Sequence, residues 1–130
     1  MLILLSAITP ILAQDIKGNV PDKEQEIFTV VEQPPAFPGG MPALSAYLSG
    51  NLKYPKKAAR KNIQGTVYIN FVVNTEGKVS EVKVLQGIGY GCDEEAARVV
   101  KKMSDWVPGM HSGRKVNVRY NLPIKFKLSN

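Results

Sequence analysis

The chain has 130 residues, 44% apolar and 22% charged, a balance typical of one globular domain with its own core. Its single cysteine, Cys92, and single histidine, His111, exclude an internal disulfide and a cysteine- or histidine-rich metal site. Five acidic and two basic residues give residues 1–40 a net charge of −3, whereas residues 41–130 carry +9. Such a basic surface suits nucleic acid, acidic lipid or an acidic protein segment, and charge alone does not choose among them.

The N-terminal region divides into two predicted segments before the domain. Residues 1–13, "MLILLSAITPILA", predict a signal peptide cleaved after Ala13, or the remnant of a membrane anchor, because the apolar run is short for a membrane span. A buried apolar strand is the alternative. Residues 14–36 predict a polar, proline-containing linker, with a short β-like piece, "IFTVV", at 27–31. One folded domain is expected at 37–130.

The first half of this domain predicts two helices and a β-hairpin. Pro42 suits the first turn of a helix that ends near Asn51, and a shorter helix follows Pro55. "TVYINFVV" and "KVSEVKVL" alternate apolar and polar residues and are joined by a turn sequence. We expect the core-facing residues to be Met41, Leu44, Tyr47 and Leu48 in the helix, Val67, Ile69, Phe71 and Val73 in the first strand, and Val82 and Val84 in the second. Val79 falls out of phase, which indicates a bulge or a frayed start.

The second half predicts a helix and a final strand. Asp93 suits a helix cap, and Cys92, Ala96, Val99, Val100 and Met103 recur at helical spacing. Trp106 is expected to be a core or rim aromatic that holds the end of this helix against the sheet, with a ligand contact as the alternative. In "VNVRYNLPIKFKL", residues 116–128, the even-numbered residues share one apolar face. Pro123 indicates an edge strand, since proline cannot donate to a sheet ladder.

The expected fold is therefore α+β: a small three-stranded antiparallel sheet with helices packed on one face, in the order helix, helix, strand, strand, helix, strand. The pattern offers no catalytic constellation, because Cys92 lies on an apolar helical stripe and no carboxylate orients His111. We expect a protein that is not an enzyme and that uses no cofactor.

Five stretches in order resemble the C-terminal domain of TonB, the energy transducer, in its Bacteroidetes-type form. They are "FPGG" at 37–40, "YP" at 54–55, "IQGTVYINFVVNTEGKVSEVKVLQG" at 63–87, "DEEAARVVKKMSDWVPG" at 93–109 and the final strand. The resemblance covers about residues 35–128. It implies a periplasmic domain that grips the TonB box, an N-terminal segment of TonB-dependent outer-membrane receptors, by β-strand addition, coupling it to energised transport.

Carried over by position, the resemblance implies two groups of partner-binding residues. They are Asn51, Leu52, Lys53 and Tyr54, and the strand residues Val116, Asn117, Val118, Arg119, Tyr120, Asn121 and Leu122. Main-chain hydrogen bonds along an exposed sheet edge can bind an extended peptide, which independently favours strand addition. Because backbone groups alternate sides and Pro123 cannot donate, we expect the odd positions to face the open edge, namely Asn117, Arg119, Asn121 and Lys125. Alternatively, Pro123 and the charges of Arg119, Lys125 and Lys127 protect the edge from aggregation.

Other architectures of the chain would imply other partners or another function. A membrane anchor would add ExbB/ExbD-type inner-membrane proteins, and the edge strand could form a homodimer. The predicted linker at 14–36 is shorter than the long Pro- and Lys-rich spacer of TonB, so a free-standing secreted adaptor without a transduction role is the alternative function expected for a chain that starts at Met1. A basic nucleic-acid-binding domain is a further alternative. The export signal and the lack of aromatics interleaved with the basic stretches disfavour it, and we expect no nucleic acid partner.

Overall fold

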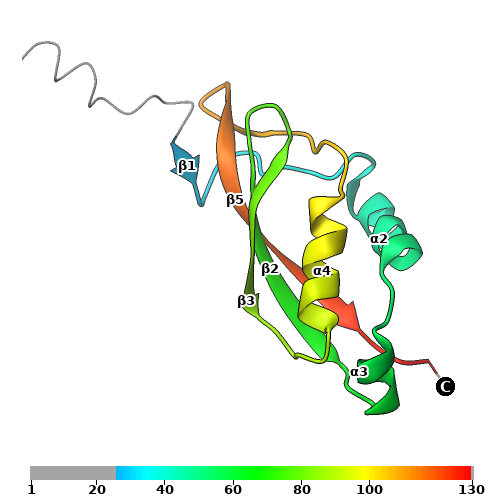
Figure 1. The fold of residues 1–130 in the computed structure, drawn as a ribbon. Coiled ribbons are helices and arrows are strands. Elements are labelled where there is room, and N and C mark those ends of the chain that lie inside the picture. Colours follow the sequence, from blue (N-terminus) through cyan, green and yellow to red (C-terminus); the bar gives the residue numbers. More distant parts are fainter. Residues whose placement is uncertain (1–25, 130) are drawn as a thin grey trace, which may run out of the picture.

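The computed structural model describes residues 26–129, so the predicted signal peptide or anchor lies outside the described residues. Its elements are β1 (Ile27–Phe28), α2 (Gly40–Asn51), α3 (Lys56–Arg60), β2 (Gly65–Val73), β3 (Val79–Gln86), α4 (Cys92–Lys101), β4 (Gly109–His111) and β5 (Arg114–Phe126) (Figure 1). The expected α+β class and the expected order of elements are confirmed, with two short strands, β1 and β4, added.

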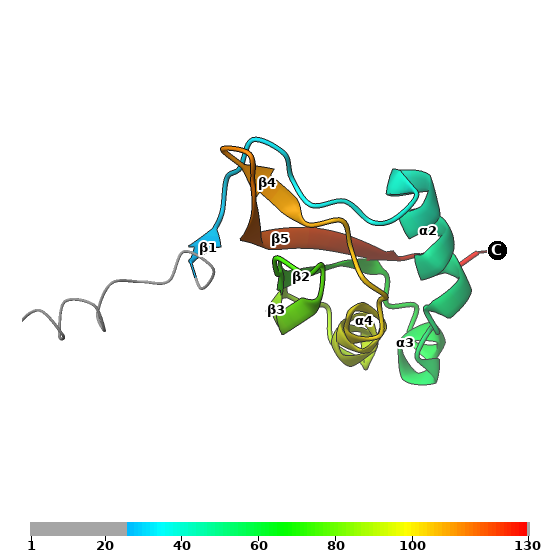
Figure 2. The same cartoon turned by 90° about the horizontal axis from the view of Figure 1, so that it is seen from above.

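The sheet has five strands, so the expected count of three was wrong. β2 lies in the middle, antiparallel to both β3 and β5, and β5 pairs with the parallel β1 and the antiparallel β4 on its other side. β4, with three residues, is too short to show alternation in a sequence, which explains why it was missed. β1 falls within the β-like piece "IFTVV" at 27–31, but its pairing with β5 was not expected. Figure 2 shows the chain from β1 to α2 running past β4, on the β5 side of the sheet and away from β3.

The core lies between α4 and the sheet, and its residues are those that the periodicity predicts. Alternate residues of β2 and the apolar stripe of α4 are at most 8% exposed, as are the even residues at the end of β5. They are Val67, Ile69, Phe71 and Val73, then Cys92, Ala96, Val99, Val100 and Met103, then Leu122, Ile124 and Phe126. Full burial of one large apolar side chain stabilises a fold by about 1.5–3 kcal/mol, so these faces fix how α4 and the sheet pack.

β3 departs from regular alternation, as the position of Val79 indicates. The register shifts between Asn70↔Lys83 and Val72↔Ser80, and Glu81 has φ 51°. This bulge places Val79 and Val82 together against the core. Val84, expected in the core, lies opposite the buried Ile69 but on the edge strand β3, and is 39% exposed. Met41, also expected to face the core, is 63% exposed.

The start of α4 also differs from expectation. The residue at its N-cap is Gly91, in a left-handed conformation with φ 89°, and not Asp93. The Asp93 Oδ1 atom instead accepts hydrogen bonds from the N–H groups of Ile88 (2.8 Å) and Gly89 (3.2 Å). Asp93 therefore ties the loop before α4 to the first turn of the helix.

Trp106 is a core residue, as predicted, with 3% of its surface exposed. Its ring packs edge-on against Phe37, Phe71 and Tyr120, with centroids 5.6, 5.4 and 5.1 Å away. Its indole N–H donates to the sulfur of Met103 (3.4 Å). Trp106 thus joins the segment before α2, the end of α4 and the sheet.

Candidate partner-binding edge

The side of β5 that faces away from β2 is paired with other strands over only part of its length. β4 lies opposite Arg114–Val116, and β1 lies opposite Asn117 and Val118. Within residues 26–129, no strand pairs with β5 on this side from Arg119 to Phe126. The predicted docking strand is therefore partly occupied by the chain itself.

Pro123 determines which backbone groups of β5 point to this edge. It lies opposite Tyr68 of β2, and because proline has no N–H this must be a non-hydrogen-bonded pair. Antiparallel pairs alternate, so the odd-numbered residues of β5 direct their backbone groups away from β2. Of the expected odd positions, Asn117 lies opposite β1, whereas Arg119, Asn121 and Lys125 lie in the uncovered part.

A groove of about 490 Å³ runs beside the uncovered end of β5. Its walls come from α2, from the segment after α2 and from β5. The lining residues are Ser45, Leu48 and Ser49, then Leu52 and Tyr54, then Pro123, Ile124, Lys125, Phe126 and Lys127. The groove mixes apolar side chains with hydroxyl and ammonium groups and has no acidic side chain in its lining.

Tyr47 fixes α2 against α4, and Tyr54 fixes the segment that follows α2 against Ile63 and β5. The Tyr47 hydroxyl donates to the carbonyl of Val99 (2.8 Å), and burial raises the pKa of this phenol. Tyr54 donates its hydroxyl to the carbonyl of Ile63 and packs edge-on against Phe126, with centroids 5.6 Å apart. The carbonyls of Val99 and Ile63, both outside the groove, therefore help to hold its walls in place.

Glu95 and Arg98 of α4, here called the Glu95–Arg98 clamp, grip the backbone of residues 51–53. The Glu95 carboxylate accepts from the Lys53 N–H (2.7 Å) and pairs with the Arg98 guanidinium (2.7 Å), which also donates to the carbonyl of Asn51 (3.0 Å). The hydrogen bond from Arg98 lowers the pKa of Glu95 below its usual value, and burial only partly opposes this. Both charges are thus used to position the segment next to the groove.

The polar side chains in the middle of β5 are held across the sheet and do not point to the edge. Arg119 donates to the Asn70 amide oxygen (2.8 Å) and pairs with Glu81 (3.2 Å). Asn121 accepts from the Asn70 amide (2.5 Å). At these positions only the backbone is directed toward the uncovered edge.

The structure brings together some of the residues expected from the sequence and separates others. Leu52 and Tyr54 lie beside the end of β5, whereas Val116, Asn117 and Val118 are at most 7% exposed and lie opposite β4 or β1. Some lining residues of the groove were not expected from the sequence, namely Ser45, Leu48, Ser49, Phe126 and Lys127. Leu48 and Phe126 lie on apolar faces that predicted burial, but no local pattern predicted the groove, because the approach of α2 to β5 is a tertiary contact.

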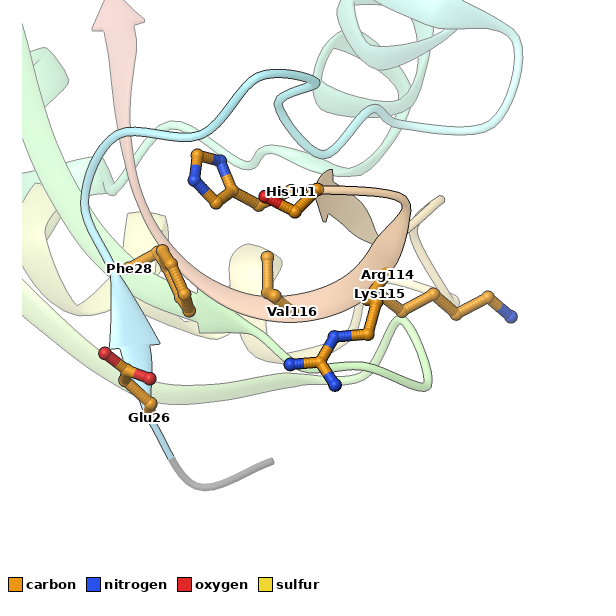
Figure 3. Close-up of a pocket in the computed structure, with 7 residues that line it drawn as sticks. Glu26, Phe28, His111, Arg114, Lys115 and Val116 are labelled. Carbon is orange, nitrogen blue, oxygen red and sulfur yellow. The ribbon is translucent and has the colours of Figure 1, made fainter. Parts of the chain in front are cut away.

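A second cavity, of about 390 Å³, lies between β1 and the β4–β5 turn. Figure 3 shows Phe28 and His111 near one another and the Lys115 side chain directed outward. The two ring centroids are 5.3 Å apart.

Across residues 26–129 no group of three or more His, Cys, Asp or Glu residues is placed to hold a metal ion. No helix in that range is long and apolar enough to cross a membrane.

The family described as Gram-negative bacterial TonB protein C-terminal matches residues 50–128. The chain belongs to this family. Two NMR solution structures of the Helicobacter pylori TonB C-terminal domain share the fold. The longer is 24% identical (TM-score 0.52; 67% of this chain and 78% of that chain covered), and the shorter is 22% identical (TM-score 0.53; 68% and 92%). Comparison with the curated proteins found no match.

Membership confirms the expected family and the expected fold. The TonB C-terminal domain is a non-enzymatic protein-interaction domain of the Gram-negative envelope, and the family implies interaction with outer-membrane receptors. The prediction that the chain is not an enzyme is confirmed on this ground.

Proposed function

We propose that this TonB C-terminal domain binds the N-terminal TonB-box segment of an outer-membrane receptor as an added strand at β5, and so couples the receptor to energised transport. The observation that carries the proposal is the uncovered edge from Arg119 to Phe126, with the groove of Leu52 and Tyr54 beside it. An extended segment bound there obtains main-chain hydrogen bonds from the odd positions of β5. Its side chains on one face would enter the groove next to α2.

The other open edge of the sheet is less suitable for strand addition. β3 has two register shifts, and Glu81 within it has φ 51°. Bulges twist an edge and interrupt its row of backbone groups, which is a common way to prevent strand pairing. β5 pairs with β2 without a shift over residues 118–126, so its row of outward groups is interrupted only at Pro123.

The proposed location is the periplasm, with a mature chain that begins near Gln14. A domain that remains part of an anchored protein would meet inner-membrane proteins of the ExbB/ExbD type. A free-standing adaptor would use the same edge without transduction. Both versions need the same binding reaction at β5.

A proline substitution in β5 tests the proposed edge directly. Lys125→Pro removes an N–H that faces the groove, so it should abolish binding of a synthetic receptor N-terminal peptide, measured by fluorescence anisotropy. Lys125→Ala removes the charge and keeps the N–H, so its affinity should stay within about tenfold of the parent, since an exposed charge contributes about 1 kcal/mol or less. Undiminished binding by folded Lys125→Pro would contradict the proposal.

Ile124→Pro is the structural counterpart. Its N–H faces β2, where Ile124 lies opposite Val67, and its side chain is 1% exposed. Loss of that ladder bond and core side chain should unfold the domain, whereas Lys125→Pro should retain the circular dichroism of the parent. Equal unfolding of both variants would show that the odd positions do not face an open edge.

A further inference from the structure

The chain already places one of its own segments on the proposed binding edge. Residues 26–32, "EIFTVVE", are here called the arm strand. Ile27 lies opposite Asn117 and Phe28 opposite Val118, and the arm strand runs parallel to β5. The next residue of β5, Arg119, is the first uncovered one. The arm strand and a partner strand would therefore lie on the same edge, end to end.

The segment that follows the arm strand is attached more firmly than the arm strand itself. Gln33 and Met110 exchange both backbone hydrogen bonds (3.0 and 2.8 Å), and so do Ala36 and Val107 (3.0 and 2.7 Å). Phe37 is buried against Trp106. These contacts would keep residues 33–37 in place when residues 26–32 leave the sheet.

The arm strand buries little of its own surface. Its pairing with β5 spans two residues, and Ile27 and Val30 are 36% and 81% exposed. The carbonyl of Glu26 accepts from the Asn117 amide (3.2 Å), and Phe28 packs on His111 in the lining of the cavity of Figure 3. At the other end, the Glu32 N–H donates to His111 Nδ1 (3.3 Å), and the Glu32 carboxylate accepts from the Ser112 N–H (2.9 Å). A segment with little buried apolar area opens at low free-energy cost.

We propose that the arm strand is a built-in competitor for the partner strand. A partner that extends past Arg119 toward Val116 must displace it, and a partner confined to Arg119–Phe126 need not. The arm strand also indicates the chemistry that the edge accepts: a carboxylate followed by aromatic and β-branched side chains, in an extended segment parallel to β5. The identity of the partner as a receptor segment rests on the proposed function, but the competition does not.

A disulfide between the arm strand and β5 tests the competition within one protein. Paired residues of neighbouring strands lie within disulfide range, so the full-length chain carrying Ile27→Cys and Asn117→Cys can be locked by oxidation and released by reduction. Native Cys92 is buried and would stay a thiol. The reduced form is the matched control, because it carries the same two substitutions.

Two probes are needed: a synthetic peptide with the sequence of residues 25–32, QEIFTVVE, and a receptor N-terminal peptide. We expect the oxidised form to bind the QEIFTVVE probe at least about tenfold more weakly than the reduced form, because the competing state is then fully populated. Equal affinity in the two forms would overturn the proposal. A disulfide that joins two chains would also overturn it, since the arm would then belong to a second copy.

A substitution that weakens the attachment of the arm strand should raise the affinity for the QEIFTVVE probe. Phe28→Ser removes the contact with His111 and should raise the affinity for QEIFTVVE severalfold, whereas Val30→Ser changes an exposed side chain and should leave it unchanged. An affinity of Phe28→Ser equal to that of the parent contradicts the competition. If the receptor peptide binds no form while QEIFTVVE responds as expected, the proposed function fails and the competition stands.

Discussion

Trp106 shows at the scale of one residue how the elements around the groove are joined. Its ring contacts Phe37, Phe71 and Tyr120 from three parts of the chain. Trp106→Ala should lower the free energy of unfolding by about 3–5 kcal/mol, measured by urea denaturation. Val107→Ala is the neighbouring control, 53% exposed, and should change it by less than about 0.5 kcal/mol. A Trp106→Ala protein as stable as the control would show that the ring is not a core contact.

Gly77 and Gly89 allow the free-energy cost of a strained backbone to be measured apart from the cost of a close contact. Both have positive φ, 85° and 77°, but a Cβ on Gly77 would lie 2.1 Å from the Trp106 carbonyl oxygen, whereas a Cβ on Gly89 meets nothing within 4 Å. Gly89→Ala should cost about 1–2 kcal/mol from the left-handed backbone alone. Gly77→Ala should cost clearly more in the same denaturation assay. Equal costs would mean that the turn moves away from Trp106 freely.

At the scale of the elements, the Glu95–Arg98 clamp joins α4 to residues 51–53. Because Arg98 lowers the pKa of Glu95 in the folded state, the ionised carboxylate stabilises the fold. This contribution is complete above the unfolded pKa of about 4.3 and is lost as the pH falls through the folded pKa.

Glu95→Gln should therefore reduce the free energy of unfolding at pH 7 by about 1–2 kcal/mol. The difference from the parent should shrink as the pH falls below about 4, measured by urea denaturation at several pH values. Glu94→Gln, on the exposed side of the same turn, is the control and should change the free energy of unfolding at pH 7 by less than about 0.5 kcal/mol. A Glu95→Gln effect independent of pH would contradict the role of the ionised carboxylate.

The helices and the long strands could be predicted from the sequence, whereas β4 and the pairing of β1 with β5 could not. β2, α4 and the end of β5 each pack an apolar face into the core, so their periodicity predicted their type and the core residues on that face. The burial of Asn70 and Val72, on the other face of β2, was not expected. "IFTVV" was recognised as β-like, but its partner, Asn117–Val118, lies about ninety residues away and left no local signal. The groove was missed for the same reason: Ser45 and Ser49 become wall residues only because α2 approaches β5.

At the scale of the whole molecule, the segment expected to be a linker, residues 14–36, contributes to the sheet from residue 27 onward. Export remains a prediction. The apolar run at residues 1–13 should be removed after Ala13, so intact-mass measurement of the protein from the periplasmic fraction should give a chain that begins at Gln14. A chain that retains Met1 and sediments with membranes would favour an anchor instead.

Amide hydrogen exchange, measured residue by residue on the full chain with and without a receptor N-terminal peptide, tests strand addition at β5 most directly. We expect the peptide to slow exchange at the odd positions Arg119, Asn121 and Lys125. The even positions, which already bond to β2, should change little. Slowing confined to β3, or none at the odd positions of β5 at saturating peptide, would contradict the proposed binding edge.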